Sequence, residues 1–286
     1  MPVNTFIATA FAATLCGAKP VFVDVNENDF LINTELIEEV VTAKTKAIIP
    51  VHLYGNVCDM DKIMEIARKH NLHVVEDCAQ AHGSLYKGKI TPVSGIGSFS
   101  FFPSKSLGAM GDAGAIVCDD EGLAKKMKMF VNHGRKDKYF HEMEGFNHRL
   151  DGLQAAILNV KLKYLSSWIK KKREIAKVYN EKLSSVKIPQ ESENVEHSYY
   201  VYVIRSGKRD ELKKYLEENG IETGVHYPTP LHLQPALFYL GYKEGDFPVA
   251  ENQAKEILSI PMYAELTEEQ QKKIIDKING FLAHEN

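Results

Sequence analysis

Two hydrophobic patterns alternate along the first half of the chain. Short, mostly apolar runs rich in β-branched residues predict strands, at Val21–Val25, Ala47–Val51, His73–Glu76, Gly97–Phe102 and Ala115–Cys118. Between several of them, Thr34–Thr42 and Met60–His70 have the spacing of amphipathic helices. Strands that alternate with helices, and that are apolar throughout, are typical of a mainly parallel sheet with helices on both faces. The first half is therefore predicted to be an α/β domain.

The second half predicts longer helices and fewer strands. Leu150–Leu183 has apolar residues at helical spacing and is expected to form one long helix. The elements expected after it are a strand at Tyr199–Ile204, a helix at Asp210–Asn219 and a last helix that starts near Thr267, where Thr267-x-x-Gln270 resembles a capping box. We expect a large domain over residues 1–165 and a small C-terminal α+β domain over residues 166–286.

The first residues, MPVNTFIATAFAATLCGA, form an apolar stretch near a methionine. No Lys or Arg precedes the apolar run, and a strand-like segment follows directly, so a buried helix is favoured over a secretion signal. No apolar stretch is long enough to predict a membrane span.

Composition and charge exclude some kinds of partner. The chain has 286 residues, of which 44% are hydrophobic, and a formal net charge of −3. Without an excess of basic residues, a nucleic acid is not expected as a partner. Cys16, Cys58, Cys78 and Cys118 are dispersed and form no C-x-x-C pair, so neither disulfides nor a metal site is expected. The cysteines fit a reducing cytoplasm.

A lysine between glycines is the first candidate for chemistry. Lys105 follows the apolar strand that ends in Ser98-Phe-Ser100-Phe-Phe, and Gly108 and Gly111 follow it. A lysine held between apolar strands loses hydration, which favours the free amine that attacks an aldehyde. Ser100 and nearby hydroxyls are suited to bind a phosphate. The segment alone fits a glycine-rich turn with a solvated lysine equally well.

An acidic residue at the end of another strand adds to this candidate site. Asp77 ends the apolar run Val74-Val75-Glu76, at the strand edge where open α/β sheets bind ligands. A carboxylate there is suited to pair with the protonated ring nitrogen of a pyridoxal cofactor. The other interpretation of Asp77 is a cap for a following helix.

Many motifs in one order resemble a known family, the DegT/StrS-type sugar aminotransferases of the fold-type I, aspartate aminotransferase-like group. They are NTFIATA, PVFVDV, IIPVHLYG, VVEDCAQAHG, SFSFFPSKSLGAMGDAGA, FNHRLDGLQAA, GVHYPTPLH and SIPMY. The resemblance implies the fold of pyridoxal phosphate-dependent transferases and a homodimer with shared active sites.

The resemblance also assigns roles around the cofactor. Lys105 matches the lysine that bonds to pyridoxal 5′-phosphate and shuttles protons, and Asp77 matches the partner of the pyridine nitrogen. Gln80 matches the residue beside the ring and its hydroxyl. Ser100 matches a phosphate ligand, and Phe6 matches the aromatic residue that stacks on the ring.

Three further residues are matched by the resemblance. Asn147 resembles an asparagine that reaches the cofactor phosphate of the neighbouring subunit. His226 and Tyr227 lie where the family binds the nucleotide sugar, although loop packing explains them equally well.

The sequence departs from the family pattern at its start. Family members carry, before the segment that matches Pro2, a helix whose amino terminus grips the cofactor phosphate. No counterpart precedes Pro2 here, so we expect an incomplete phosphate site and exposed apolar surface around Thr9–Leu15.

The reaction implied by the resemblance is transamination of a nucleoside-diphosphate keto-hexose with L-glutamate as amino donor. The stretch HYPTPLHLQP resembles enzymes that act at sugar C3 with thymidine diphosphate as carrier. The alternatives are a non-catalytic or regulatory relative and an inactive fragment that needs a missing N-terminal segment. A dinucleotide-binding oxidoreductase is excluded because no G-x-G-x-x-G follows an early strand.

Overall fold

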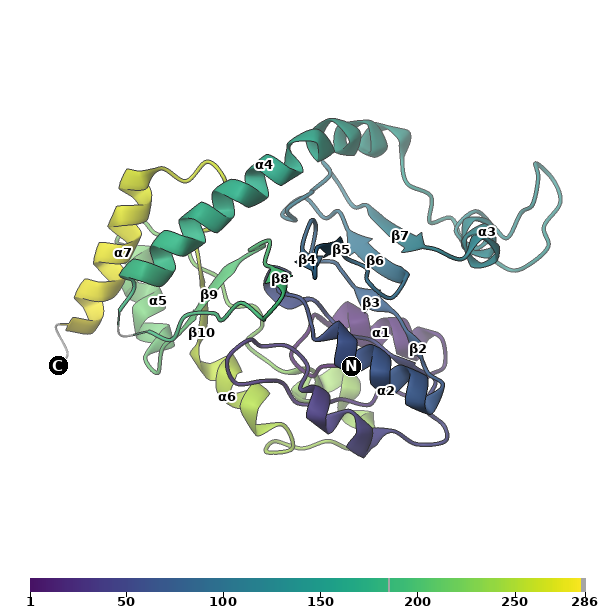
Figure 1. Ribbon diagram of the computed structural model, residues 1–286, viewed down its shortest axis with the longest axis horizontal. Coiled ribbons are helices and arrows are strands. Elements are labelled where there is room, and N and C mark those ends of the chain that lie inside the picture. The colour runs from purple at the N-terminus through teal and green to yellow at the C-terminus, as the bar shows by residue number, and fades with distance from the viewer. Residues whose placement is uncertain (185, 284–286) are drawn as a thin grey trace.

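A computed structural model describes residues 1–184 and 186–283 of the chain (Figure 1). Its α-helices are α1 (Ile7–Leu15), α2 (Met60–His70), α3 (Glu121–Phe130), α4 (Gly152–Lys182), α5 (Arg209–Glu218), α6 (Pro248–Glu256) and α7 (Glu268–Ala283). Short 3-10 helices lie at Thr34–Leu36, Glu38–Val40, Leu53–Gly55, Leu231–Leu233 and Pro235–Leu240. The strands are β1 (Ala47–Ile48), β2 (His73–Val74), β3 (Glu76–Asp77), β4 (Leu85–Tyr86), β5 (Lys89–Ile90), β6 (Ile96–Ser100), β7 (Gly114–Cys118), β8 (Val195–Glu196), β9 (Tyr202–Arg205) and β10 (Ile257–Ile260).

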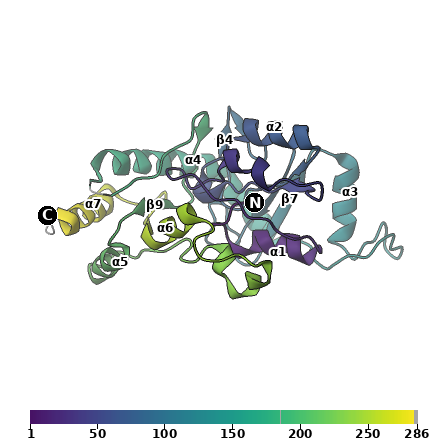
Figure 2. The same cartoon turned by 90° about the horizontal axis from the view of Figure 1, so that it is seen from below.

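Parallel pairing brings the ends of consecutive strands to one edge. β1 pairs with β2, β3 pairs with β6, and Val51 bridges Asp77, all in parallel. β7 runs antiparallel to β6. Figure 2 shows α1 and α2 on opposite sides of these strands. The predicted α/β fold with helices on both faces is confirmed, and Asp77 and Ser100 lie at strand ends.

Local sequence explains why α2 forms as predicted. Asp59 caps its first turn by accepting from the Lys62 amide at 3.1 Å, and the last turn is basic. Asn71 ends the helix in the left-handed region, at φ 52°. The buried face packs into the main core, with Ile63 and Ile66 almost inaccessible to solvent.

The long helix and the capping box are also confirmed. α4 is continuous over 31 residues and joins the region of β6 and β7 to the region of α5 and α7 (Figure 1). At the start of α7, the Thr267 amide donates to Gln270 Oε1 at 3.0 Å, and the Gln270 amide donates to Thr267 Oγ1 at 3.2 Å.

Three local predictions differ from the structure. Thr34–Thr42 forms two short 3-10 helices instead of one α-helix. Val21–Val25 forms isolated bridges at Val23 and Val25 instead of a strand. The helix predicted at the start is present as α1, but only Thr9 and Ala10 are buried in it, and Leu15 is 87% exposed. The prediction of a buried helix was therefore wrong, because no described segment covers its outer face, whereas the exposed apolar surface predicted around Thr9–Leu15 is present at Phe11 and Leu15.

Three clusters of buried side chains account for most of the core. The largest lies around β1, β2 and α2, and the second joins α4, α5 and α7 to β9 and β10. The third packs Val3 and Phe22 against Leu231 and Leu237, so the first residues and the Pro-bearing segment of the second half share a core.

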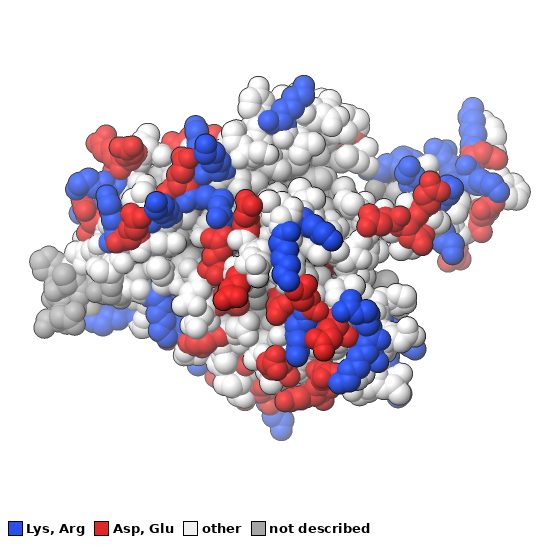
Figure 3. Space-filling model, in the orientation of Figure 1, with Lys and Arg blue, Asp and Glu red and all other residues white. Residues whose placement is uncertain are grey.

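The surface of the described residues gives no indication of a membrane or polyanion partner. No helix of the described residues is both long and apolar enough to cross a membrane. On the face drawn in Figure 3, Lys and Arg are interspersed with Asp and Glu, without a field of a single sign.

Candidate active site

Lys105 lies on a tight loop between β6 and β7. The Lys105 amide donates to the Phe102 carbonyl at 2.9 Å, and the Ala109 amide returns to the Phe101 carbonyl at 2.8 Å. A Cβ at Gly108 would lie 2.3 Å from the Pro103 carbonyl oxygen, so the loop requires glycine there. The loop therefore holds Lys105 at the end of β6.

Tyr200 and Asp77 are the neighbours of the Lys105 amine, and its burial together with Asp77 shifts its pKa. Its Nζ lies 4.5 Å from the centre of the Tyr200 ring, which is a cation–π contact. Burial lowers the pKa of Lys105, and the charge of Asp77 opposes this by raising it. The net direction is downward, so the free amine is more populated at neutral pH than for an exposed lysine.

The Asp77 carboxylate is held by two donors. Oδ2 accepts from the Thr9 hydroxyl at 2.7 Å, and Oδ1 accepts from the Ala79 amide at 3.0 Å. Thr5 lies 3.1 Å from the Thr9 hydroxyl and completes the chain of oxygens. No helix follows Asp77 directly, so its side chain closes a turn instead of capping a helix. The carboxylate is preoriented at the strand end.

Gln80 links the predicted stacking residue to the second half of the chain. Its Oε1 accepts from the Tyr54 amide at 2.7 Å, and its Nε2 donates to the Tyr227 hydroxyl at 3.0 Å. The Tyr227 ring lies 5.5 Å from the ring of Phe6, centre to centre. Phe6 is 54% exposed, so one face remains open to a ligand. The structure thus brings Phe6, Gln80 and Tyr227 together.

His226 is anchored beside this group. Its Nδ1 lies 2.8 Å from Ser259 Oγ, and its carbonyl accepts from the Tyr54 hydroxyl. Burial lowers the pKa of His226, and the positive charge of Lys105 lowers it further. Both effects favour the neutral form of the His226 ring, and the second shows that the charge of Lys105 reaches it.

Ser100 and Asn147 lie apart from each other. Ser100 is the last residue of β6, and its Oγ accepts from the Phe102 amide at 3.3 Å. Asn147 is exposed on the arm between α3 and α4 and bridges Asn132. The arm projects away from the strands (Figure 1). Among the described residues, no hydrogen bond joins Asn147 to Lys105 or Ser100.

Sequence reasoning missed several residues of this site. Thr9 and Tyr200 contact Asp77 and Lys105 from distant parts of the chain. His82 lies buried between Phe99 and Phe101, with ring centres 5.4 and 5.7 Å apart. Burial, and then the Lys105 charge, lower the pKa of His82 to about 4. The position of His82, two residues after Gln80, was the feature of the sequence that could have identified it as a site residue.

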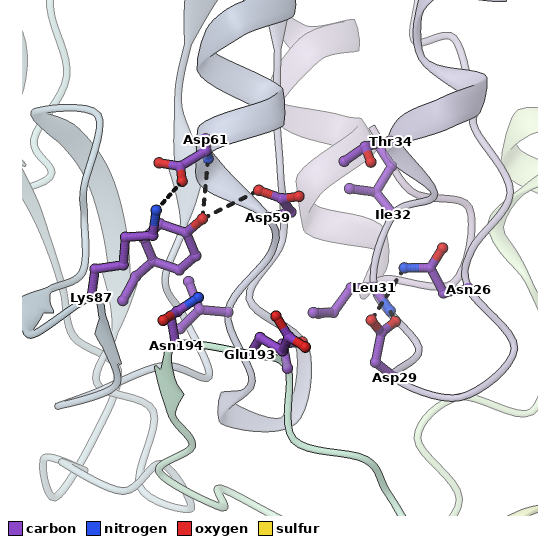
Figure 4. Close-up of a pocket in the computed structure, with 13 residues that line it drawn as sticks. Asn26, Asp29, Leu31, Ile32, Thr34, Asp59, Asp61, Lys87, Glu193 and Asn194 are labelled. Atoms are coloured by element: carbon purple, nitrogen blue, oxygen red, sulfur yellow. Dashed lines mark hydrogen bonds and ion pairs between the residues drawn. The ribbon is translucent and has the colours of Figure 1, made fainter.

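Two other polar clusters are separate from this site. Figure 4 shows a cavity of about 400 Å³ whose polar groups largely pair with one another, as Lys87 does with Asp61 and the Tyr86 hydroxyl with Asp59. Elsewhere His52, Glu76 and Cys78 lie close enough to hold a metal. However, His52 Nε2 lies 2.7 Å from Glu76, whose oxygens also accept the amides of residues 93 and 94. That pair therefore anchors a loop.

Comparison with known proteins identifies the family of the chain. The sequence profile of the DegT/DnrJ/EryC1/StrS aminotransferase family matches residues 1–279. The chain belongs to this family. The predicted resemblance is confirmed, and the chain is a pyridoxal phosphate-dependent aminotransferase by family and by fold.

Some similar proteins are named as regulatory proteins, and others are named as transaminases. A pleiotropic regulatory protein of Geobacillus stearothermophilus is 49% identical over 286 residues, which cover 98% of this chain and 77% of the relative. The dTDP-3-amino-3,4,6-trideoxy-alpha-D-glucose transaminase of Streptomyces venezuelae is 39% identical over 97% of this chain and 74% of its own length. The crystal structure of S. venezuelae DesV in complex with a ketimine intermediate has a TM-score of 0.96 and 38% identity, and covers 98% of this chain and 77% of that one.

The residues present fit the cofactor of this aminotransferase family. Other solved structures of the fold hold it in its PLP and PMP forms. Here the Lys105 amine has a lowered pKa, the Asp77 carboxylate is held in place at the end of β3, and the Phe6 ring is more than half exposed beside Tyr227. This donor set suits an aldehyde, a protonated ring nitrogen and a planar ring.

Thr9→Val is expected to lower kcat/KM for amino transfer by about 10- to 100-fold. The Thr9 hydroxyl donates to the Asp77 carboxylate, and a hydrogen bond to a charged group contributes about 1.5–3 kcal/mol. Valine keeps the shape of threonine without this donor. Thr14→Val on the same helix removes a hydroxyl that bonds a backbone carbonyl instead, and serves as the control in steady-state kinetics. Equal rates for the two variants would contradict the role of Thr9.

Proposed function

We propose that the chain transfers the amino group of L-glutamate to the keto group of a nucleoside-diphosphate hexose. The observation that carries the proposal is the half-buried amine of Lys105 within reach of the Asp77 charge, beside which Gln80 donates to the Tyr227 hydroxyl and the Tyr227 ring lies against Phe6. A substrate of the dTDP-3-oxo-6-deoxyhexose class is favoured by the HYPTPLHLQP stretch and by the names of relatives that are dTDP-3-aminosugar transaminases.

Each residue has a defined task in this proposal. Bound pyridoxal phosphate supplies an electron sink for the charge that develops at the reacting carbon. Lys105 Nζ takes the proton from the amino donor and later delivers a proton to the sugar carbon. The Asp77 carboxylate keeps the ring nitrogen protonated, and Gln80 orients the ring hydroxyl. Phe6 excludes water from one ring face.

The remaining roles concern the phosphate and the sugar. Ser100 donates its hydroxyl to the phosphate, and His226 and Tyr227 contact the nucleotide sugar. Asn147 reaches the phosphate site of a second subunit, since its arm points away from its own strands. Exposed apolar side chains on the arm and α4 support a homodimer with shared sites: Phe140, Phe146, Leu153 and Val160 are each more than half exposed.

The proposal extends to organisation and location. Residues 1–165 form the large cofactor-binding domain and residues 166–286 the small α+β domain, in line with the separate cluster around α5 and α7, while Leu231 and Leu237 pack back on the large domain. The four cysteines are free, which fits a reducing cytoplasm. Neither nucleic acid nor a membrane is a proposed partner.

A regulatory role without catalysis is the second candidate. It is supported by the name of the relative from Geobacillus stearothermophilus. It does not account for an amine of lowered pKa beside a held carboxylate, because binding alone needs no free amine.

Absorption spectroscopy tests the proposed function. Purified chain is mixed with pyridoxal phosphate, separated from the excess, and then given L-glutamate or glutarate, which lacks the amino group. We expect a visible band that L-glutamate bleaches and glutarate leaves unchanged. If other amino acids bleach the band and L-glutamate does not, the assignment of L-glutamate as the amino donor is wrong. Absence of any band would favour the regulatory candidate.

A further inference from the structure

A second cavity of about 330 Å³ lies beside Lys105. It is enclosed by the Ser104–Ser106 loop, by α4 and by the Met262–Glu265 segment, and Tyr200 also lines it. We call it the α4 pocket. Because Lys105 itself lines it, a group bound there lies next to the reactive amine.

Two lysines of α4 face this pocket without a counter-charge. Lys172 is only 5% exposed, and its Nζ donates to Ser106 Oγ at 2.9 Å. Lys161 donates to the carbonyl of Gly108. Among the described residues, neither amine has a carboxylate within ion-pair distance, and the carboxylate that lines the pocket belongs to exposed Glu265.

A buried ammonium without an anion is costly. Burial lowers the pKa of Lys172 to about 8, since the charged form loses hydration and gains only one neutral hydroxyl. Lys172 could donate to Ser106 with less cost as a neutral side chain. An anion in the pocket would supply the missing counter-charge and satisfy the remaining N–H groups. The Ser104 and Tyr200 hydroxyls, 3.5 Å apart, add neutral donors at the same wall.

We propose that the α4 pocket binds an oxyanion group of a reactant through the amines of Lys161 and Lys172. The proposal rests on the proposed function, in which the amino donor carries carboxylates and the sugar carries a diphosphate. Both groups present the same chemistry, oxygen atoms that share negative charge, and both must approach Lys105. The pocket volume suits such a group better than a whole nucleotide sugar.

Isothermal titration calorimetry of the full chain separates the two sources. Glutarate stands for the carboxylates of the donor, and dTDP for the diphosphate of the sugar nucleotide. Each is titrated into the wild type, Lys172→Met and Lys161→Met. Lys163→Met is the matched control, because Lys163 is exposed on the same helix. Loss of one charge-assisted contact is expected to weaken binding about tenfold or more, and the control is expected to match the wild type.

Each outcome decides the proposal. If the lysine variants weaken only glutarate binding, the pocket binds a carboxylate of the amino donor. If they weaken only dTDP binding, it binds the diphosphate of the sugar nucleotide. If they weaken both, the pocket binds each group at a different stage of the reaction. The proposal is overturned if neither Lys161→Met nor Lys172→Met changes either affinity, or if the wild type binds neither anion. The lysines then only tether the loop. The two variants are independent, so poor folding of one leaves the other decisive.

The same samples distinguish this proposal from the proposed function. The visible band after loading with pyridoxal phosphate is recorded alongside each titration. Anion binding that depends on Lys172, without a band, would leave the pocket in place and refute the transaminase activity. A band that L-glutamate bleaches equally in Lys161→Met, Lys172→Met and the wild type, with unchanged affinities, would refute the pocket alone.

Discussion

Replacing Lys105 by alanine is expected to lower kcat/KM for amino transfer by about 10⁴-fold or more. The amine of Lys105 is half-buried, and its lowered pKa makes it the free base that the reaction needs. The neighbouring amines of Lys161 and Lys172 bond to Gly108 and to Ser106, and are not free to replace it. Steady-state rates and the visible absorption after cofactor loading measure the loss.

Two further variants separate chemistry from charge. Lys105→Arg keeps the positive charge over Tyr200, but a guanidinium stays protonated at all working pH values, so the same loss is expected. Lys163→Ala changes an exposed lysine and is expected to keep the wild-type rate. A Lys105→Ala protein that retains a rate within tenfold of the wild type would show that another group moves the proton.

Elements with local stabilisation were predictable from the sequence. α2 has its own cap and basic last turn, and α4 has a long apolar periodicity, so both match their predictions. Thr34–Thr42 has the same periodicity over a shorter span, and the structure divides it into two 3-10 helices. A helix that short depends on tertiary packing.

Burial was harder to predict than helicity. The apolar residues of α1 suggested a core helix, because hydrophobicity indicates burial only when a partner segment covers it. In the structure Phe11 and Leu15 remain exposed, while the polar Thr9 is buried against Asp77. The side of α1 that faces the core therefore carries a polar hydrogen bond at Thr9 as well as the buried Ala10, and periodicity does not reveal that hydrogen bond.

The candidate site shows the same limit. The order of Asp77, Ser100 and Lys105 is visible in the sequence, and because β3 and β6 pair in parallel, Asp77 and Ser100 end at one edge with Lys105 on the loop that follows. Tyr200 lies far along the chain from Lys105, and Tyr227 far from Gln80. Such contacts follow from the packing of the second half on the first.

Asp77→Asn is expected to lower kcat/KM by about 10²–10⁴-fold. With the cofactor bound, Asp77 would face its protonated ring nitrogen, and removal of one charge from such an enclosed pair costs about 3–5 kcal/mol, which corresponds to this range of rates. Asparagine keeps the shape of Asp77 but has one acceptor oxygen for the Thr9 hydroxyl and the Ala79 amide, so the part of the loss that exceeds that of Thr9→Val reports on charge. Steady-state kinetics of Asp77→Asn beside Thr9→Val provide the measurement, and similar small losses in both would contradict a role for the charge.

The same substitution has an effect that does not depend on the cofactor. The charge of Asp77 raises the pKa of Lys105 against the larger lowering by burial. In Asp77→Asn burial acts with less opposition, so the pKa of Lys105 falls and its free amine appears at lower pH. Acetylation of Lys105 in cofactor-free protein, followed by mass spectrometry against pH, is expected to reach half its maximal rate at lower pH than in the wild type. Thr9→Val keeps the charge and is expected to give the wild-type curve. If the Asp77→Asn curve does not move, the two groups do not interact, and the kinetic loss must arise at the cofactor alone.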